Sequence, residues 1–167
     1  ELFKIYDINP SAANSLAEFV QKLGFNVQAC DSLRDSSKDA DIVLEATTSK
    51  KTIIFLENLN PPVHVISIGV TGSDVSLIER DVILQAEMIV VDSKKAVMKE
   101  VGDLRPLVEK GLLRENEILE IGDIIMGKRI KRTDSGITVF KSVGLAIQDT
   151  CEAGLAYKKA SEKGIGR

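Results

Sequence analysis

Several residue types are scarce in this chain, and their scarcity excludes several kinds of site. The 167 residues include no tryptophan, one histidine and two cysteines. The cysteines, Cys30 and Cys151, lie far apart without the close spacing of metal ligands, so we expect two packed free thiols and no metal site. This cysteine usage is typical of a reducing compartment and predicts a cytoplasmic protein. The single histidine, His64, follows Pro61 and Pro62, and we interpret it as structural.

Long apolar runs and a strong excess of one charge are also missing. No apolar stretch approaches the ~18–20 residues of a membrane-spanning helix, so a membrane is not expected as a partner. The net charge of −3 gives no electrostatic basis for binding nucleic acid. With 44% hydrophobic and 28% charged residues, the composition is that of a globular domain with a buried core.

Short apolar stretches alternate with amphipathic segments along the first part of the chain. Asn9 and Pro10 predict the start of the first helix, and Gly24 predicts its end. The expected strands span residues 3–6, 26–30, 41–48, 63–70 and 88–93, and the other expected helices span residues 34–40 and 76–86. Buried strands that alternate with helices are typical of a parallel sheet covered on both faces, so we predict a doubly wound α/β fold of Rossmann type.

The last third of the chain has a different pattern. We expect helical structure over residues 94–111 with a turn near Gly102, a short helix over 118–126 and a strand over 136–140. A long closing helix is expected from Ser142. Its many small residues predict that it lies against the sheet or crosses into a neighbouring region.

An acidic residue, Asp7, ends the first expected strand. In dinucleotide-binding folds such a carboxylate binds the adenosine ribose, about 20 residues after a Gly-rich turn that this sequence does not contain. The alternative is that Asp7 caps the following helix locally. The turns at 46–49 and 67–69 also end strands, and they consist of small or hydroxyl-bearing residues with donors to offer. Three such turns at one sheet edge favour a cofactor site.

Together these segments resemble the ornithine cyclodeaminase/mu-crystallin family. The matching runs are IYDINPSAA, ADIVLEATTS, VISIG, IVVDS, IGDIIMGK and ITVFKSVGLAIQDTCEA. The resemblance implies an NAD(P)-binding domain over residues 1–140 that lacks its first strand and Gly-rich loop. Residues 141–167 would be a closing helix that packs toward an absent substrate and dimerisation domain. The missing strand would leave a free edge beside residues 3–6, so we expect the isolated chain to be unstable or to aggregate.

The resemblance also implies roles for individual residues. Asp7 would bind the adenosine ribose, and its charge would favour NAD over NADP. The other cofactor contacts that the resemblance implies are Thr47, Thr48, Ile68, Gly69 and Ser142, with Thr71 and Val143 beside the substrate. For Ser142 there is an alternative: its hydroxyl caps the closing helix.

One departure from the family pattern concerns the turn after residue 69. Ornithine cyclodeaminases carry a catalytic aspartate where this chain has Thr71, and a lysine where it has Val75. Asp74 could replace the aspartate only if this loop were remodelled. Threonine cannot act as a general base at neutral pH, so ornithine cyclodeamination is disfavoured.

The predicted function is therefore that of an NAD-dependent oxidoreductase or deaminase acting on a small amino acid or a cyclic imine. Alanine-dehydrogenase, ketimine-reductase and ornithine-cyclodeaminase types stay open, and the proton-transfer residues are expected upstream of Glu1. The alternative is a non-catalytic NAD(P)-binding protein like mu-crystallin. The resemblance also implies a homodimer.

Overall fold

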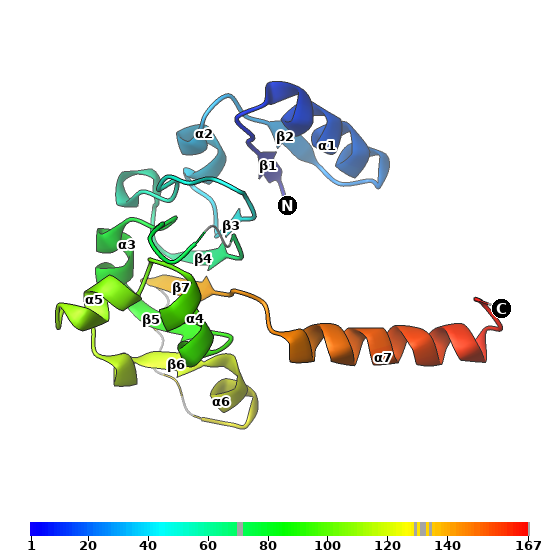
Figure 1. Cartoon of the computed structure of the whole chain (residues 1–167). Helices are drawn as coiled ribbons and strands as arrows, with labels where there is room; N and C mark the ends of the chain where they lie inside the picture. The colour runs from blue at the N-terminus through cyan, green and yellow to red at the C-terminus, as the bar shows by residue number, and fades with distance from the viewer. Residues whose placement is uncertain (70–71, 129, 131–132, 134, 167) are drawn as a thin grey trace.

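The computed structural model describes residues 1–69, 72–128, 130, 133 and 135–166 (Figure 1). The strands are β1 (Phe3–Ile5), β2 (Val27–Ala29), β3 (Ile42–Glu45), β4 (Val63–Ser67), β5 (Ala86–Val91), β6 (Ile118–Glu120) and β7 (Ile137–Lys141). The helices are α1 (Pro10–Lys22), α2 (Leu33–Ser37), α3 (Arg80–Gln85), α4 (Lys94–Glu100), α5 (Arg105–Glu109), α6 (Ile121–Ile125) and α7 (Ala146–Glu162), with 3-10 turns at Leu56–Asn58 and Glu115–Glu117.

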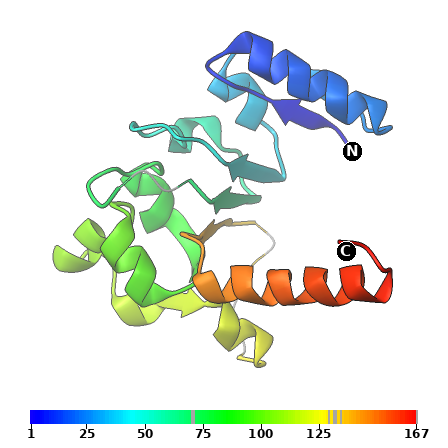
Figure 2. The same ribbon diagram turned by 45° about the vertical axis from the view of Figure 1, so that its right-hand side comes forward.

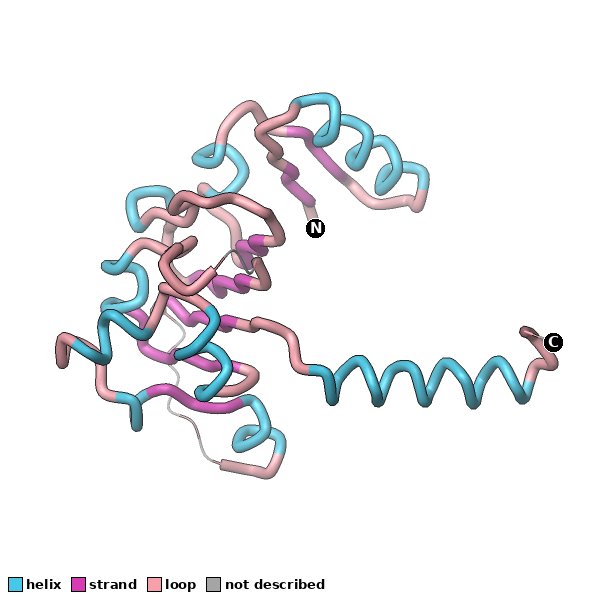
Figure 3. Tube along the Cα trace, viewed as in Figure 1, coloured by secondary structure: helices cyan, strands magenta, loops and turns pink. Residues whose placement is uncertain are grey.

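The predicted α/β class with parallel strands is confirmed, but the strands form two sheets. One sheet pairs β1 with β2, and the other has the order β3-β4-β7-β5-β6. All of these pairings are parallel. The tube in Figure 3 shows the helices of the central region lying beside the larger sheet. The fully buried side chains of Val65 in β4 and Val139 in β7 lie in its core.

The first helix begins and ends where the sequence predicts. The Asn9 side chain caps α1 by accepting a 3.0 Å hydrogen bond from the Ser11 N–H, and Pro10 occupies the first turn. Gly24 follows the helix with φ of 91°, a conformation that glycine adopts without a steric penalty.

Four expected helices differ in extent: α2 ends at Ser37 instead of residue 40, and in two of the other three, strand pairing overrides local preference. Ile78 forms a parallel bridge with Ile54, so α3 begins only at Arg80. Residues 118–120 pair with β5 as strand β6, which leaves only α6 of the helix expected there. The closing helix α7 starts at Ala146, four residues later than expected.

The opening strand is less buried than its apolar sequence predicts. Phe3 is 44% exposed, and within the described part of the chain β1 pairs with β2 alone. Strand β3 is an outermost strand of the larger sheet and pairs with β4 alone. Its residues Ile42 and Leu44 are each 60% exposed. Figure 2 shows the β1–β2 pair with α1 standing apart from the larger sheet. The end strands β1, β2, β3 and β6 therefore each leave one edge without a partner among the described residues, and β1 and β3 are the two that also expose large apolar side chains.

The closing helix α7 projects away from the sheet (Figure 1). None of its 17 residues, all of which the structure describes, is buried. The expectation that it lies against the sheet is wrong, whereas its crossing into a neighbouring region stays a prediction. Cys151 on this helix is exposed, so the prediction of a packed thiol is wrong for it, although both cysteines are free as expected. Cys30 is half-buried, and this burial raises the pKa of its thiol.

No helix in the described ranges is both long enough and apolar enough to span a bilayer.

Two leucines test where the core lies. Leu104 is 1% exposed and Leu112 is 52% exposed. Leu104→Ala should lower the free energy of unfolding by about 2–5 kcal/mol, because it removes buried methyl groups and leaves a cavity. Leu112→Ala, the same deletion at the surface, should cost less than about 1 kcal/mol. Urea denaturation monitored by circular dichroism checks this, and equal losses in the two variants would contradict the placement of the core.

Candidate functional site

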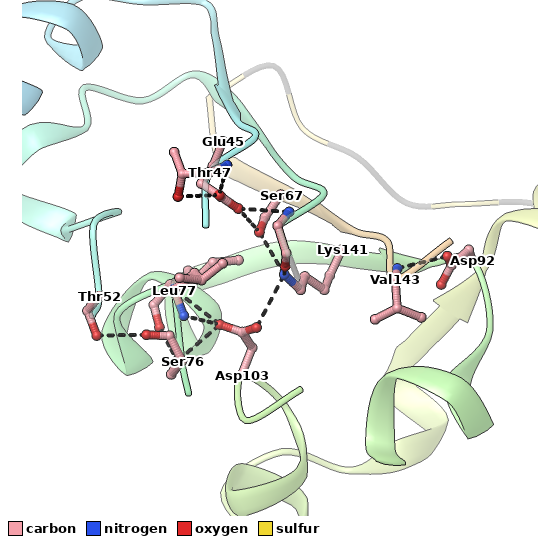
Figure 4. Close-up of polar contacts among 12 residues, drawn as sticks. Glu45, Thr47, Thr52, Ser67, Ser76, Leu77, Asp92, Asp103, Lys141 and Val143 are labelled. Atoms are coloured by element: carbon pink, nitrogen blue, oxygen red, sulfur yellow. Dashed lines mark hydrogen bonds and ion pairs between the residues drawn. The ribbon is translucent and has the colours of Figure 1, made fainter. Parts of the chain in front are cut away.

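Charged and polar residues end three neighbouring strands at one edge of the larger sheet (Figure 4). Glu45 ends β3, Ser67 ends β4 and Lys141 ends β7, and the parallel register aligns them in a row. Asp92 directly follows β5 at the same edge. Ligands of open α/β sheets bind outside the carboxyl ends of the strands, so this edge is the candidate site.

The carboxylate of Glu45 connects two of the turns that the sequence points to. It is only 4% exposed. Its Oε1 accepts hydrogen bonds from the N–H of Thr47 at 2.7 Å and from its hydroxyl at 3.0 Å. Its Oε2 accepts the Ser67 hydroxyl at 2.6 Å and the Gly69 N–H at 3.2 Å. The donors expected to face a cofactor at these turns therefore point inward to a buried carboxylate.

The ammonium group of Lys141 is fully buried at the next position of the row. Its Nζ donates to Ser67 Oγ at 2.8 Å and to the Gly69 carbonyl oxygen at 2.7 Å. It also lies 3.4 Å from Asp103 Oδ2, within a buried ion pair. Asp103 Oδ1 in turn accepts hydrogen bonds from the segment 76–78. Lys141 therefore links the end of β4 to the turn that precedes α5.

A second buried carboxylate, Asp92, holds the segment that follows β7. Its Oδ2 accepts the Ser142 hydroxyl at 2.7 Å and the backbone N–H groups of Val143 and Gly144 at 2.9 Å each. Because these donors are bound to Asp92, residues 142–144 stay outside α7. The cap position of α7 is Leu145, so the interpretation of Ser142 as a helix cap is wrong.

The other sequence-predicted residues are more exposed. Asp7 lies two residues after the end of β1 on the smaller sheet, and its Oδ1 accepts the Asn9 N–H at 2.7 Å. It does not cap α1, as the alternative for this residue proposed, because the cap is Asn9. Thr48 is exposed, and Ile68 is 48% exposed between two buried neighbours. Thr71 lies outside the described residues. The structure thus brings Thr47, Gly69, Ser142 and Val143 to one sheet edge. They are held there by hydrogen bonds to Glu45 and Asp92, two residues that the sequence analysis did not single out.

His64 fits its structural interpretation. It lies in β4, and its Nδ1 is 2.7 Å from the Thr138 hydroxyl on the neighbouring strand β7.

Sequence reasoning missed Glu45, Asp92, Asp103 and Lys141. One signal could have found three of them: a charged residue closes an otherwise apolar strand in the runs IVLE, IVVD and TVFK. A charge is buried in such a place only when partners satisfy it. Asp103 carries no comparable signal, because it lies in a loop.

Comparison with known proteins gives a consistent assignment. The family model described as "Ornithine cyclodeaminase/mu-crystallin family" matches residues 1–164. A Delta(1)-pyrroline-2-carboxylate reductase of Bacillus cereus is 35% identical over an alignment of 169 residues, which covers 99% of this chain and 52% of that protein. The chain therefore spans about half the length of this curated relative.

Two solved structures have the same fold. The Delta(1)-pyrroline-2-carboxylate reductase of Thermococcus litoralis, in complex with NADH and L-proline, matches with a TM-score of 0.92 and 35% identity over 100% of this chain and 52% of its own. An archaeal alanine dehydrogenase dimer with bound NAD matches with a TM-score of 0.87 and 27% identity over 99% of this chain and 51% of its own.

Two glycines test how tightly this edge is packed. A Cβ at Gly69 would collide with the Glu45 carboxylate and lie 2.8 Å from Leu77 Cδ1, whereas a Cβ at Gly154 in α7 would meet nothing within 4 Å. Gly69→Ala should lower the free energy of unfolding by about 1–3 kcal/mol through overpacking. Gly154→Ala should raise it by roughly 0.5–1 kcal/mol through helix propensity. Changes of the same sign in urea denaturation would refute this account of Gly69.

Proposed function

The chain belongs to the ornithine cyclodeaminase/mu-crystallin family, and on that premise we propose that it forms the nucleotide-binding part of an NAD-dependent oxidoreductase. The substrate is a small amino acid or a cyclic imine. The observation that carries this proposal is the match of the whole chain to the Thermococcus litoralis reductase, whose complex contains both NADH and L-proline.

The carboxyl edge of the larger sheet has a surface that suits a dinucleotide. Its turns carry short side chains, which leave room for a ligand to approach the backbone. Ile68 is 48% exposed and offers an apolar surface for the nicotinamide ring. The proposed cofactor contacts along this edge are Thr47, Thr48, Ile68, Gly69 and Ser142. The donors of Thr47, Gly69 and Ser142 are held by Glu45 and Asp92, so these three residues would contact the cofactor through atoms other than those hydrogens. Bound NAD supplies the hydride chemistry, while the protein orients the cofactor and the substrate.

The proposed role of Asp7 is to bind the adenosine ribose. The side chain is exposed at the carboxyl end of β1, as this role requires. A carboxylate in this place would repel a 2′-phosphate, so NAD is the proposed cofactor in preference to NADP.

Among the possible reactions, we favour reduction of a cyclic imine. The carbon–nitrogen double bond of the imine accepts a hydride from NADH and a proton, and the product is a cyclic amino acid. The 35%-identical relatives named as pyrroline-carboxylate reductases support this choice. Thr71 and Val143 are the proposed residues beside the substrate. Oxidation of an amino acid such as alanine uses the same hydride transfer in reverse.

Cyclodeamination is less well supported. It would need a general base, and the family's aspartate is replaced by Thr71. Asp74, the possible substitute, has a 91% exposed side chain, and its Oδ1 lies 3.4 Å from the Arg105 guanidinium. Its carboxylate is therefore directed to solvent and to a competing partner.

A second candidate is a non-catalytic NAD-binding protein. The loss of the family's aspartate and lysine at Thr71 and Val75 is the observation that favours it. Such a protein would bind NADH without consuming any imine.

The domain arrangement is also a proposal. Residues 1–140 form a dinucleotide-binding domain in which a further parallel strand joins the free edges of β1 and β3. Residues 141–167 reach a second domain that completes the substrate site and the contact of a homodimer. The exposed apolar residues of β3 and the unburied helix α7 support this arrangement. We place the protein in the cytoplasm, on the basis of its cysteine usage.

The cofactor proposal predicts the effect of removing the Asp7 charge. Asp7→Ser should shift the affinity ratio of NADPH to NADH at least about fivefold toward NADPH, because charge repulsion of the 2′-phosphate is worth roughly 1 kcal/mol or more. Fluorescence titration of the complete protein with each nucleotide measures this ratio. Asp41→Ser is the matched control, since Asp41 precedes β3 and so lies at the amino ends of the strands of the larger sheet, away from the proposed site. An unchanged ratio in Asp7→Ser would remove the ribose role.

The substrate proposal predicts the outcome of one activity panel. The complete protein should oxidise NADH in the presence of Delta(1)-pyrroline-2-carboxylate, and proline should accumulate in equal amount. With NAD and ornithine it should release little ammonia, because Thr71 cannot act as the base. NADH binding without turnover of any imine or amino acid would instead support the binding protein.

A further inference from the structure

Three buried side chains form a row across the ends of β3, β4 and β7. Glu45 pairs in register with Ser67, and Ser67 pairs with Lys141. Residues paired across parallel strands point to the same face of a sheet, so these side chains converge, as Figure 4 shows. They are 4%, 0% and 0% exposed, respectively. The row consists of the last residues of these strands, and the turns at which we place the cofactor follow directly after it.

This row holds the residue Gly69 from both sides of its backbone. Glu45 Oε2 accepts the Gly69 N–H, while Lys141 Nζ donates to the Gly69 carbonyl oxygen. The Ser67 hydroxyl joins the two charged groups, because it donates to Glu45 and accepts from Lys141. Glu45 also binds both donors of Thr47. Two turns are therefore oriented by one connected set of buried groups.

Stability alone does not explain why charged groups occupy this row. Removing a carboxylate and an ammonium from water is costly, and well-packed apolar residues of similar volume often stabilise a protein as much or more. The arrangement is also incompletely satisfied, since Asp103 Oδ2, the ion-pair partner of Lys141, is buried without a hydrogen bond. What the charged row supplies, and an apolar row could not, is the orientation of the Gly69 backbone.

We propose that Glu45, Ser67 and Lys141 are positioning residues for the nicotinamide end of NAD. They draw Gly69 and Thr47 inward, and this leaves the Ile68 side chain as the exposed surface beside the ring. The surface is then formed before the cofactor binds, which lowers the cost of ordering it. This inference rests on the proposed function, because it takes NAD as the ligand.

The test is the variant Ser67→Ala in the complete purified protein. It removes the hydroxyl that joins Glu45 to Lys141 but leaves both charged groups with other partners. NADH and ADP-ribose, which lacks the nicotinamide, are each titrated by calorimetry. We expect NADH to bind about tenfold more weakly, the equivalent of one hydrogen bond, while the ADP-ribose affinity changes less than about twofold.

Ser76→Ala is the matched control. The Ser76 hydroxyl donates to the Ile78 carbonyl oxygen and to Asp103 Oδ1, so it belongs to the same polar region without contacting Gly69. Its removal should leave the ratio of the two affinities unchanged. The urea midpoint of each variant reports any general loss of stability, which would weaken both ligands alike.

The outcomes separate the inference from the function on which it rests. If Ser67→Ala weakens both ligands equally or neither, or if Ser76→Ala changes the ratio as much, the positioning role is wrong and NAD binding stands. If the unmodified protein binds neither ligand, the proposed function is overturned and the positioning role with it.

Discussion

The buried contact of the Glu45 carboxylate, the Ser67 hydroxyl and the Lys141 ammonium is the constraint on which the candidate site depends. Charged groups without water must find partners inside the protein, and here the partners are the turns at the strand ends. The same rule explains Asp92, whose carboxylate holds the backbone of Val143 and Gly144 outside the closing helix. Burial of charge therefore decides the path of the chain along this sheet edge.

The unpaired edges of β1 and β3 place a second constraint on the molecule. Strand edges offer unpaired backbone groups, which proteins ordinarily cover or pair. Here β1 and β3 each have one partner among the described residues, and β3 also carries exposed leucine and isoleucine side chains. The proposed joining strand and second domain would cover these surfaces and α7 together. One arrangement thus accounts for exposed features that lie far apart in the sequence.

Much of the fold could be predicted because its signals are local. At the start of α1, the cap by Asn9 and the first-turn Pro10 each depend on residues within about one helical turn. At its end, the positive φ of Gly24 is equally local. The predicted helix over residues 118–126 was wrong for 118–120, because their identity as a strand depends on pairing with β5, nearly 30 positions earlier in the chain, and right for 121–125. At the candidate site, small residues drew attention to the turns at 46–49 and 67–69, whose role stays a prediction, whereas the buried charges of Glu45 and Lys141 were not predicted.

By itself, the sequence determined the class of fold and the family, because apolar periodicity, capping residues and short motifs act over a few positions. Only the tertiary structure decided where the donors of the turns at the strand ends point. Lys141 meets the carbonyl oxygen of Gly69, and Glu45 meets its N–H, across separations of 72 and 24 residues. Contacts of that range exist only after the strands have been aligned, since the register of a parallel sheet brings the strand ends together.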